Sequence, residues 1–63
     1  MGMSVEFIKR YLPEVMVDGE PGWRVAGREN KFATVYHPQT AESFEVTWET
    51  LARVLNNGGS IIR

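Results

Sequence analysis

The fold is decided by the stretch Ser43-Phe-Glu-Val-Thr-Trp-Glu-Thr-Leu-Ala-Arg-Val-Leu-Asn-Asn-Gly-Gly59, because its hydrophobic spacing changes after Thr47. Before this point, apolar and polar residues alternate, which is typical of a half-buried strand. After it, apolar residues recur three and four positions apart, as they do on one face of a helix, at Trp48, Leu51, Ala52 and Leu55. The stretch therefore predicts a strand over residues 43–47 that passes directly into a helix.

Both ends of this helix have local signals. Thr47 is a good N-cap, Glu49 suits the positive helix end, and Asn57-Gly58 tolerates a left-handed stop. Trp48 belongs to the strand pattern and to the helix pattern at once. We therefore expect it to be the core residue whose loss is most damaging.

The preceding residues predict one further helix and three further strands. The helix runs from Val5 to Leu12, with Ser4 as its cap and Pro13 as its stop. The strands cover residues 14–18, 23–27 and 31–37, with turns at 18–22 and 27–30. Short connections favour an antiparallel meander. The predicted fold class is α+β, a small four-stranded antiparallel meander with an N-terminal and a C-terminal helix packed on one face (α-β-β-β-β-α).

Two sets of apolar residues have a predicted position. In the first helix, Phe7 and Tyr11 lie beside the apolar face and are expected in the core. The third strand is ambiguous, because Ala33 and Val35 share one face while Phe32 and Tyr36 share the other. If Ala33 and Val35 pack under the helices, then Phe32 and Tyr36 project outward near Met16 and Arg24.

With 63 residues, the chain has room for a single small domain, residues 1–63. A core of this size supplies about 3–5 kcal/mol of stability, and small proteins often supplement it with disulfides, a metal or oligomerisation. The sequence has no cysteine, which removes the disulfide and thiolate-zinc options. We therefore expect a homodimer.

The sequence contains no recognisable catalytic, cofactor or metal motif. His37 is the only histidine, and before Pro38 it is interpreted as a solvated residue at a strand end. Glu42, Glu45 and Glu49 straddle the change from strand to helix, so they are interpreted as a solvated acidic rim. We expect no catalytic residue, no cofactor, no metal and no enzymatic activity.

No apolar run is long enough to cross a bilayer, and the first residues lack the layout of a signal peptide. We therefore expect a cytoplasmic protein without a membrane partner. The net charge of −1 neither attracts nor repels nucleic acid strongly, so a nucleic-acid role requires a local basic patch.

One region of the predicted sheet combines basic and aromatic residues. Exposed aromatics and arginines are enriched at protein interfaces, so the preferred function is a small binding module that acts by protein contact, as an adaptor, inhibitor or accessory protein. The alternative is a single-stranded nucleic-acid-binding protein, because aromatics and cations on a sheet also stack bases. The residues predicted to bind the partner are Met16, Arg24, Arg28, Lys31, Phe32, Thr34 and Tyr36.

Overall fold

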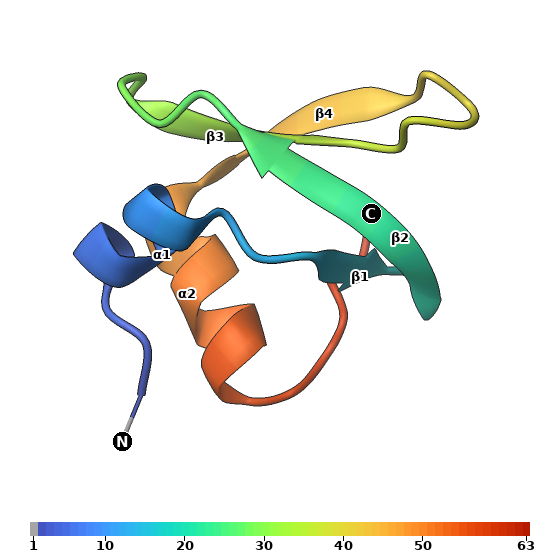
Figure 1. The fold of residues 1–63 in the computed structure, drawn as a ribbon. Helices are drawn as coiled ribbons and strands as arrows, with labels where there is room; N and C mark the ends of the chain where they lie inside the picture. The colour runs from blue at the N-terminus through green and yellow to red at the C-terminus, as the bar shows by residue number, and fades with distance from the viewer. Residues whose placement is uncertain (1) are drawn as a thin grey trace.

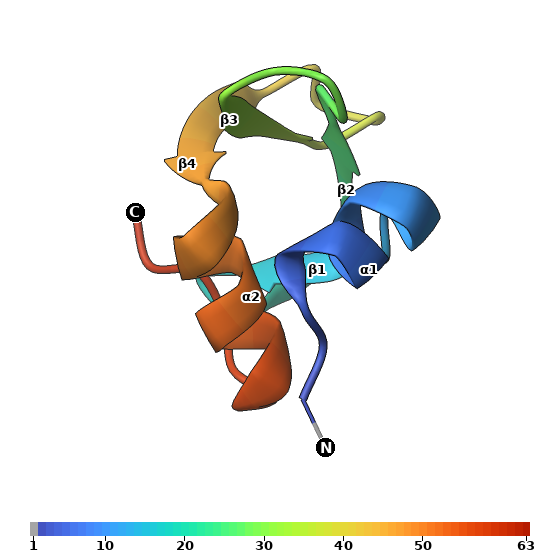
Figure 2. The same cartoon turned by 90° about the vertical axis from the view of Figure 1, so that its left-hand side faces the viewer.

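The computed structural model describes residues 2–63. Its elements are α1 (Val5–Tyr11), β1 (Val15–Val17), β2 (Glu20–Ala26), β3 (Phe32–Tyr36), β4 (Ser43–Thr47) and α2 (Trp48–Asn56). The four strands pair antiparallel in chain order. They form a curled sheet, and both helices cover its inner side (Figure 1; Figure 2). The predicted α+β meander is confirmed.

The helix α1 begins and ends close to the predicted residues. The Ser4 hydroxyl accepts a hydrogen bond from the Phe7 N–H at 3.1 Å. At the other end, Leu12 adopts a left-handed conformation with φ of 46°, and its N–H donates to the Ile8 carbonyl at 2.8 Å. Pro13 follows, and it cannot continue the helix.

The prediction that Phe7 and Tyr11 belong to the core is wrong. Their side chains are 45% and 62% exposed, and their rings stack with centroids 4.5 Å apart. The reason is that α1 buries only Ile8 completely, with Val5 and Leu12 packed beside it. One narrow stripe therefore meets the core, and the flank that carries the two aromatics stays exposed.

The turn between β1 and β2 is shorter than predicted. Asp18 and Gly19 form it alone, with φ of 51° and 81°, and two positive φ angles are what a type I′ hairpin turn requires. Pro21 and Gly22, predicted as turn residues, belong to β2. An Asp-Gly pair is sufficient for a two-residue hairpin, so the chain pairs again from Glu20.

The β1–β2 ladder contains a β-bulge. Val17 faces Glu20 but Val15 faces Trp23, so Pro21 and Gly22 together oppose one β1 residue, Met16. A bulge accommodates a proline, which has no N–H for the ladder. It also bends the strand, and β2 curves between the β1 hairpin and the β3–β4 hairpin (Figure 1).

In β3, Ala33 and Val35 are the pair that faces the core. Both are fully buried under the helices, while Phe32 is exposed on the opposite face. In β4, Phe44 and Val46 face the same core and are partly buried.

The caps of α2 are those that the sequence predicts. The Thr47 hydroxyl accepts from the Thr50 N–H at 3.1 Å. Gly58 has φ of 64°, and the N–H groups of Gly58 and Gly59 donate to the carbonyls of Leu55 and Val54. This pair of bonds is a Schellman motif, which satisfies the last carbonyls of a helix.

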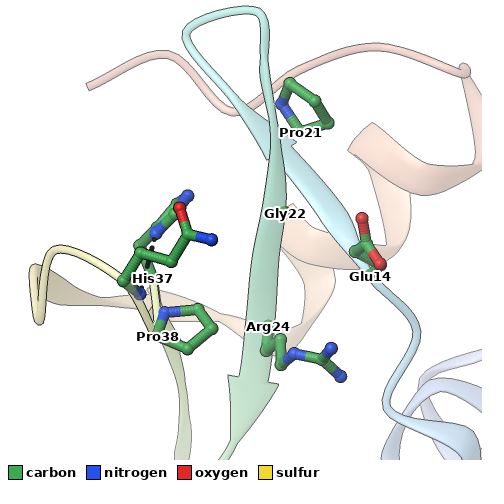
Figure 3. Close-up of a pocket in the computed structure, with 7 residues that line it drawn as sticks. Glu14, Pro21, Gly22, Arg24, His37 and Pro38 are labelled. Carbon is green, nitrogen blue, oxygen red and sulfur yellow. Dashed lines mark hydrogen bonds between the residues drawn. The ribbon is translucent and has the colours of Figure 1, made fainter.

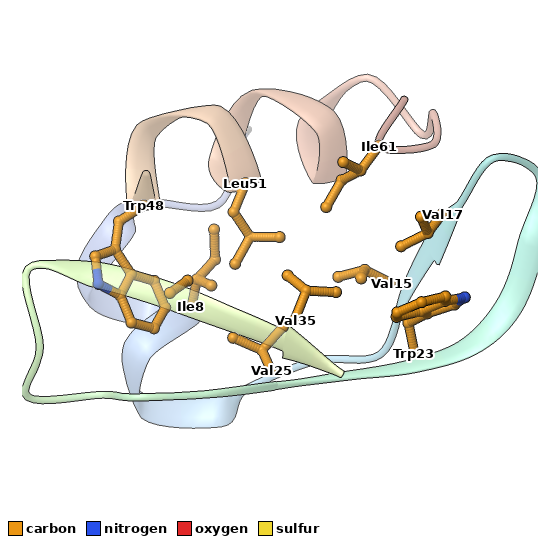
Figure 4. Close-up of a cluster of buried hydrophobic side chains, with 10 residues drawn as sticks. Ile8, Val15, Val17, Trp23, Val25, Val35, Trp48, Leu51 and Ile61 are labelled. Carbon is orange, nitrogen blue, oxygen red and sulfur yellow. The ribbon is translucent and has the colours of Figure 1, made fainter. Parts of the chain in front are cut away.

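The core lies between the helices and the inner side of the sheet (Figure 4). Trp23 is its largest fully buried member, at 1% exposure. Trp48 is buried as predicted, and its indole N–H donates to the Asn30 carbonyl at 3.0 Å, which ties the start of α2 to the β2–β3 turn. The buried side chains are Ile8, Val15, Val17, Trp23, Val25, Ala33, Val35, Trp48, Leu51 and Ile61.

A C-terminal segment that the sequence analysis did not assign closes the free edge of β1. Ile61 forms a parallel bridge with Val17, donates its N–H to Met16 and accepts from the Asp18 N–H. Arg63 then spans from the β1–β2 turn to the start of β4. Its Nε is 3.6 Å from an Asp18 oxygen and its Nη1 is 3.4 Å from a Glu42 oxygen.

The Arg63 guanidinium also lies over two rings, with its Cζ 4.9 Å from the Trp23 ring centre and 5.2 Å from that of Phe44. Exposed ion pairs contribute little, about 0–1 kcal/mol each. We therefore attribute the contribution of Arg63 to the stability of the fold mainly to its contacts with the two aromatic rings.

Replacing Trp48 by alanine is expected to unfold most of the protein. Removing a buried aromatic costs about 3–5 kcal/mol, which is comparable to the roughly 3–5 kcal/mol that a core of this size supplies. Trp48→Phe keeps an aromatic ring in the core but leaves the Asn30 carbonyl without its donor, at a smaller cost of about 1–3 kcal/mol. Urea unfolding followed by circular dichroism measures both losses of stability. A Trp48→Ala variant whose unfolding midpoint is close to that of the parent contradicts the expectation.

Candidate interaction site

The side of β2, β3 and β4 that faces away from the helices is here called the outer face. It consists of the residues that alternate with the buried ones. The strand register arranges these residues in rows that run across β2, β3 and β4. The rows are Arg24–Tyr36–Ser43, Ala26–Thr34–Glu45 and, on β3 and β4 alone, Phe32–Thr47.

The two aromatic residues of the outer face lie at opposite ends of β3. Phe32 is 44% exposed, whereas Thr34 and Tyr36 are half-buried. The two aromatics are four positions apart on β3, which is about 13 Å along an extended strand. Tyr36 is the direct neighbour of Arg24, while Phe32 stands alone next to the β2–β3 turn.

Met16 does not lie near Phe32, so the prediction that these two residues are neighbours is wrong. Met16 is exposed on β1, and β2 separates β1 from β3. The sequence pattern gives the face on which Met16 lies, but its distance from β3 depends on the strand order and on the bulge.

The structure also divides the predicted basic set. The Arg28 side chain turns toward α1, and its Nη2 lies 3.4 Å from the Arg10 carbonyl oxygen. There it lines a surface depression with Glu6, Lys9 and Arg10. Lys31 is exposed in the β2–β3 turn, and only Arg24 stands on the outer face. Arg24, Arg28 and Lys31 therefore do not form one stripe beside the aromatics.

A pocket of about 370 Å³ opens over β2 at the bulge, and we call it the Gly22 pocket (Figure 3). Glu14 and Arg24 approach it from one side of β2, and His37 and Pro38 approach it from the other. The residues that line it are Glu14, Pro21, Gly22, Arg24, His37, Pro38 and Gln39.

Because Gly22 has no side chain, a space remains beside it, and His37 borders this space. It has φ of 94°, a conformation that residues with a side chain rarely adopt. A Cβ at this position would lie 3.4 Å from Nε2 of His37. The bulge that bends the strand thus also provides a stretch of pocket wall without a side chain.

His37 has a fixed orientation. Its Nδ1 accepts a hydrogen bond from the Gln39 N–H at 3.2 Å, which leaves Nε2 as the ring nitrogen that can donate. The ring packs edge-on against Trp23, with centroids 5.2 Å apart and an angle of 83° between the planes. The imidazole therefore presents an N–H donor near Gly22. It is half-buried, unlike the solvated residue that the sequence suggested.

Sequence reasoning assigned none of the pocket residues except Arg24 to a site. Pro21 and Gly22 were interpreted as turn residues and His37 as a strand end. The sequence has a dense Pro and Gly signal over residues 18–22. Which of these residues form a bulge depends on how β2 pairs with β1, and the signal alone does not predict that pairing.

The chain matches no family model, no curated protein and no solved structure. Within residues 2–63, no group of three or more His, Asp or Glu side chains is arranged to hold a metal ion. Neither of the two helices that the structure describes is long and apolar enough to cross a membrane.

Proposed function

We propose that this chain is a small non-catalytic binding module that acts by protein contact through its outer face, and that its partner includes a second copy of itself. The observation that carries the proposal is the 44% exposure of Phe32 on a sheet face that no described element covers. Exposed aromatics on such a face are a feature of protein interfaces.

The charges of the outer face support pairing with a second copy. Arg24 lies on β2 and Glu45 on β4, on either side of β3. A two-fold axis parallel to β3 places β2 of one copy over β4 of the other. Each Arg24 then faces the strand that carries Glu45, and every favourable contact occurs twice.

The size of the protein gives a second reason for such pairing. Among residues 2–63, only ten side chains form the buried core, and small domains with so little core are often stabilised by association. Covering Phe32 and the adjoining rows adds apolar burial that the monomer lacks.

The double variant Phe32→Glu, Tyr36→Glu is expected to be monomeric, because it places four carboxylates in the two-fold interface. The matched control is Phe7→Glu, Tyr11→Glu, which changes the exposed aromatic pair on α1 and leaves the outer face intact. Size exclusion with light scattering measures both. A parent that is monomeric at tens of micromolar, or a control that dissociates equally, contradicts the homodimer.

The alternative function, single-stranded nucleic-acid binding, has less support, because Arg24 lies on the outer face while Arg28 lies against α1. Without a continuous basic stripe beside the aromatics, we expect no binding of a labelled oligonucleotide at tens of micromolar protein in low salt. Fluorescence anisotropy measures this. Binding that weakens with a slope near −0.7 per neutralised phosphate would instead favour the nucleic-acid role.

A further inference from the structure

We infer that the exposed side of α1 binds a short acidic segment of a partner protein, which contacts α1 through both carboxylates and an apolar side chain. We call this surface the α1 flank. Because α1 covers the inner side of the sheet, the flank is separate from the outer face, and the inference does not require the dimer (Figure 1; Figure 2). The residues that line the flank are Glu6, Phe7, Lys9, Arg10, Tyr11 and Arg28.

Two depressions adjoin on the α1 flank, because Glu6 and Arg10 line both of them. The first has a volume of about 250 Å³ and is also lined by the two aromatic rings of α1. The second has a volume of about 370 Å³ and is also lined by Lys9 and Arg28. The flank is therefore one continuous surface with an aromatic side and a basic side.

The basic side has an excess of positive charge. Its cations are Lys9, Arg10 and Arg28, and Glu6 is the one carboxylate among the residues that line it. Among residues 2–63, every ion pair involves Arg63, so these three cations have no carboxylate partner. Cations gathered in this way attract an anionic partner, and the guanidinium groups suit the two oxygens of a carboxylate.

Two of these cations are positioned by contacts with the rest of the fold. The Arg28 Nη2 lies 3.4 Å from the Arg10 carbonyl oxygen, which brings a cation of the β2–β3 loop to α1. The Lys9 Nζ lies 5.3 Å from the centre of the Trp48 ring. Side chains that are already placed lose less entropy when a ligand binds, so a short segment can use these contacts.

The aromatic side favours a ligand that carries an apolar side chain. Phe7 and Tyr11 are 45% and 62% exposed, and their ring centroids are 4.5 Å apart, so the two rings form one apolar surface. Arg10 lines the same depression. Exposed aromatics beside an arginine are the residues that most often contribute binding energy at protein interfaces.

The position of Glu6 favours a peptide over a nucleic acid or an anionic membrane. Because Glu6 lines both depressions, its carboxylate repels a ligand whose negative charges follow one another closely, as phosphates do. A peptide carries acidic and apolar side chains at separate positions. Its carboxylates can contact the basic side while an apolar side chain lies over the aromatic rings.

The first test is fluorescence anisotropy with a short labelled peptide of alternating glutamate and leucine. We expect a dissociation constant on the order of 10–100 μM. One control peptide has serine in place of leucine, and the other has lysine in place of glutamate. Each control is expected to bind at least about tenfold more weakly, because the first lacks the apolar contact and the second has the wrong charge. Equal affinity for the parent peptide and either control overturns the inference.

The second test locates the carboxylate contacts. The double variant Arg10→Gln, Arg28→Gln is expected to weaken binding of the glutamate–leucine peptide about tenfold, because it removes two charged contacts. The matched control is Arg24→Gln, Lys31→Gln, which removes the same charge from residues that do not line the flank. It is expected to change the affinity by less than about twofold, because distant charges are screened by salt. Equal losses in the two double variants overturn the inference.

The third test concerns the aromatic side. Phe7→Ala, Tyr11→Ala is expected to remain folded by circular dichroism, since both side chains are exposed, and to bind the peptide at least about tenfold more weakly. An unchanged affinity overturns the inference. So does tighter binding of an oligonucleotide or of phosphatidylserine vesicles than of the peptide, if the Arg10→Gln, Arg28→Gln variant loses it. None of the flank variants changes the outer face, so failure of this inference is distinguishable from failure of the proposed dimer.

Discussion

The insertion of one extra residue in β2 is the constraint on which the rest of this structure depends. In a regular hairpin that continued from the Val17–Glu20 pair, Val15 would face Gly22, and Arg24 would share the core side of the sheet. The bulge at Pro21 and Gly22 shifts the pairing by one, so Val15 faces Trp23 instead. Trp23 and Val25 then point inward, and Arg24 points outward. A single residue thereby decides which side chains form the core and which form the surface.

The two sides of the bulge have different roles. On the inner side, Trp23 is buried in the core, and the guanidinium of Arg63 lies over its ring and reaches Glu42 beside β4. On the outer side, the missing side chain of Gly22 opens the pocket that Arg24 and His37 line. The packing of His37 against Trp23 connects the two, so the same ring supports the core and orients a donor in the pocket.

Features with local causes could be predicted from the sequence, and features that depend on pairing could not. The caps at Ser4 and Thr47, the stop at Gly58 and the order of elements follow from neighbouring residues. The exposure of Phe7 and Tyr11 depends on how narrow a stripe of α1 meets the core. The edge position of Met16 depends on the strand order, and the turn of Arg28 toward α1 depends on how the β2–β3 loop lies against that helix. The sequence therefore predicted the outward position of Arg24, Phe32 and Tyr36 but not the pocket at the bulge.

The register of the β1–β2 hairpin tests this account most directly, and cross-strand NOEs between backbone protons measure it. The bulge predicts contacts between Val15 and Trp23 and between Val17 and Glu20. A regular ladder, with contacts from Val15 to Gly22 and from Met16 to Pro21, would contradict it, because Arg24 would then lie on the core side and the Gly22 pocket would not form.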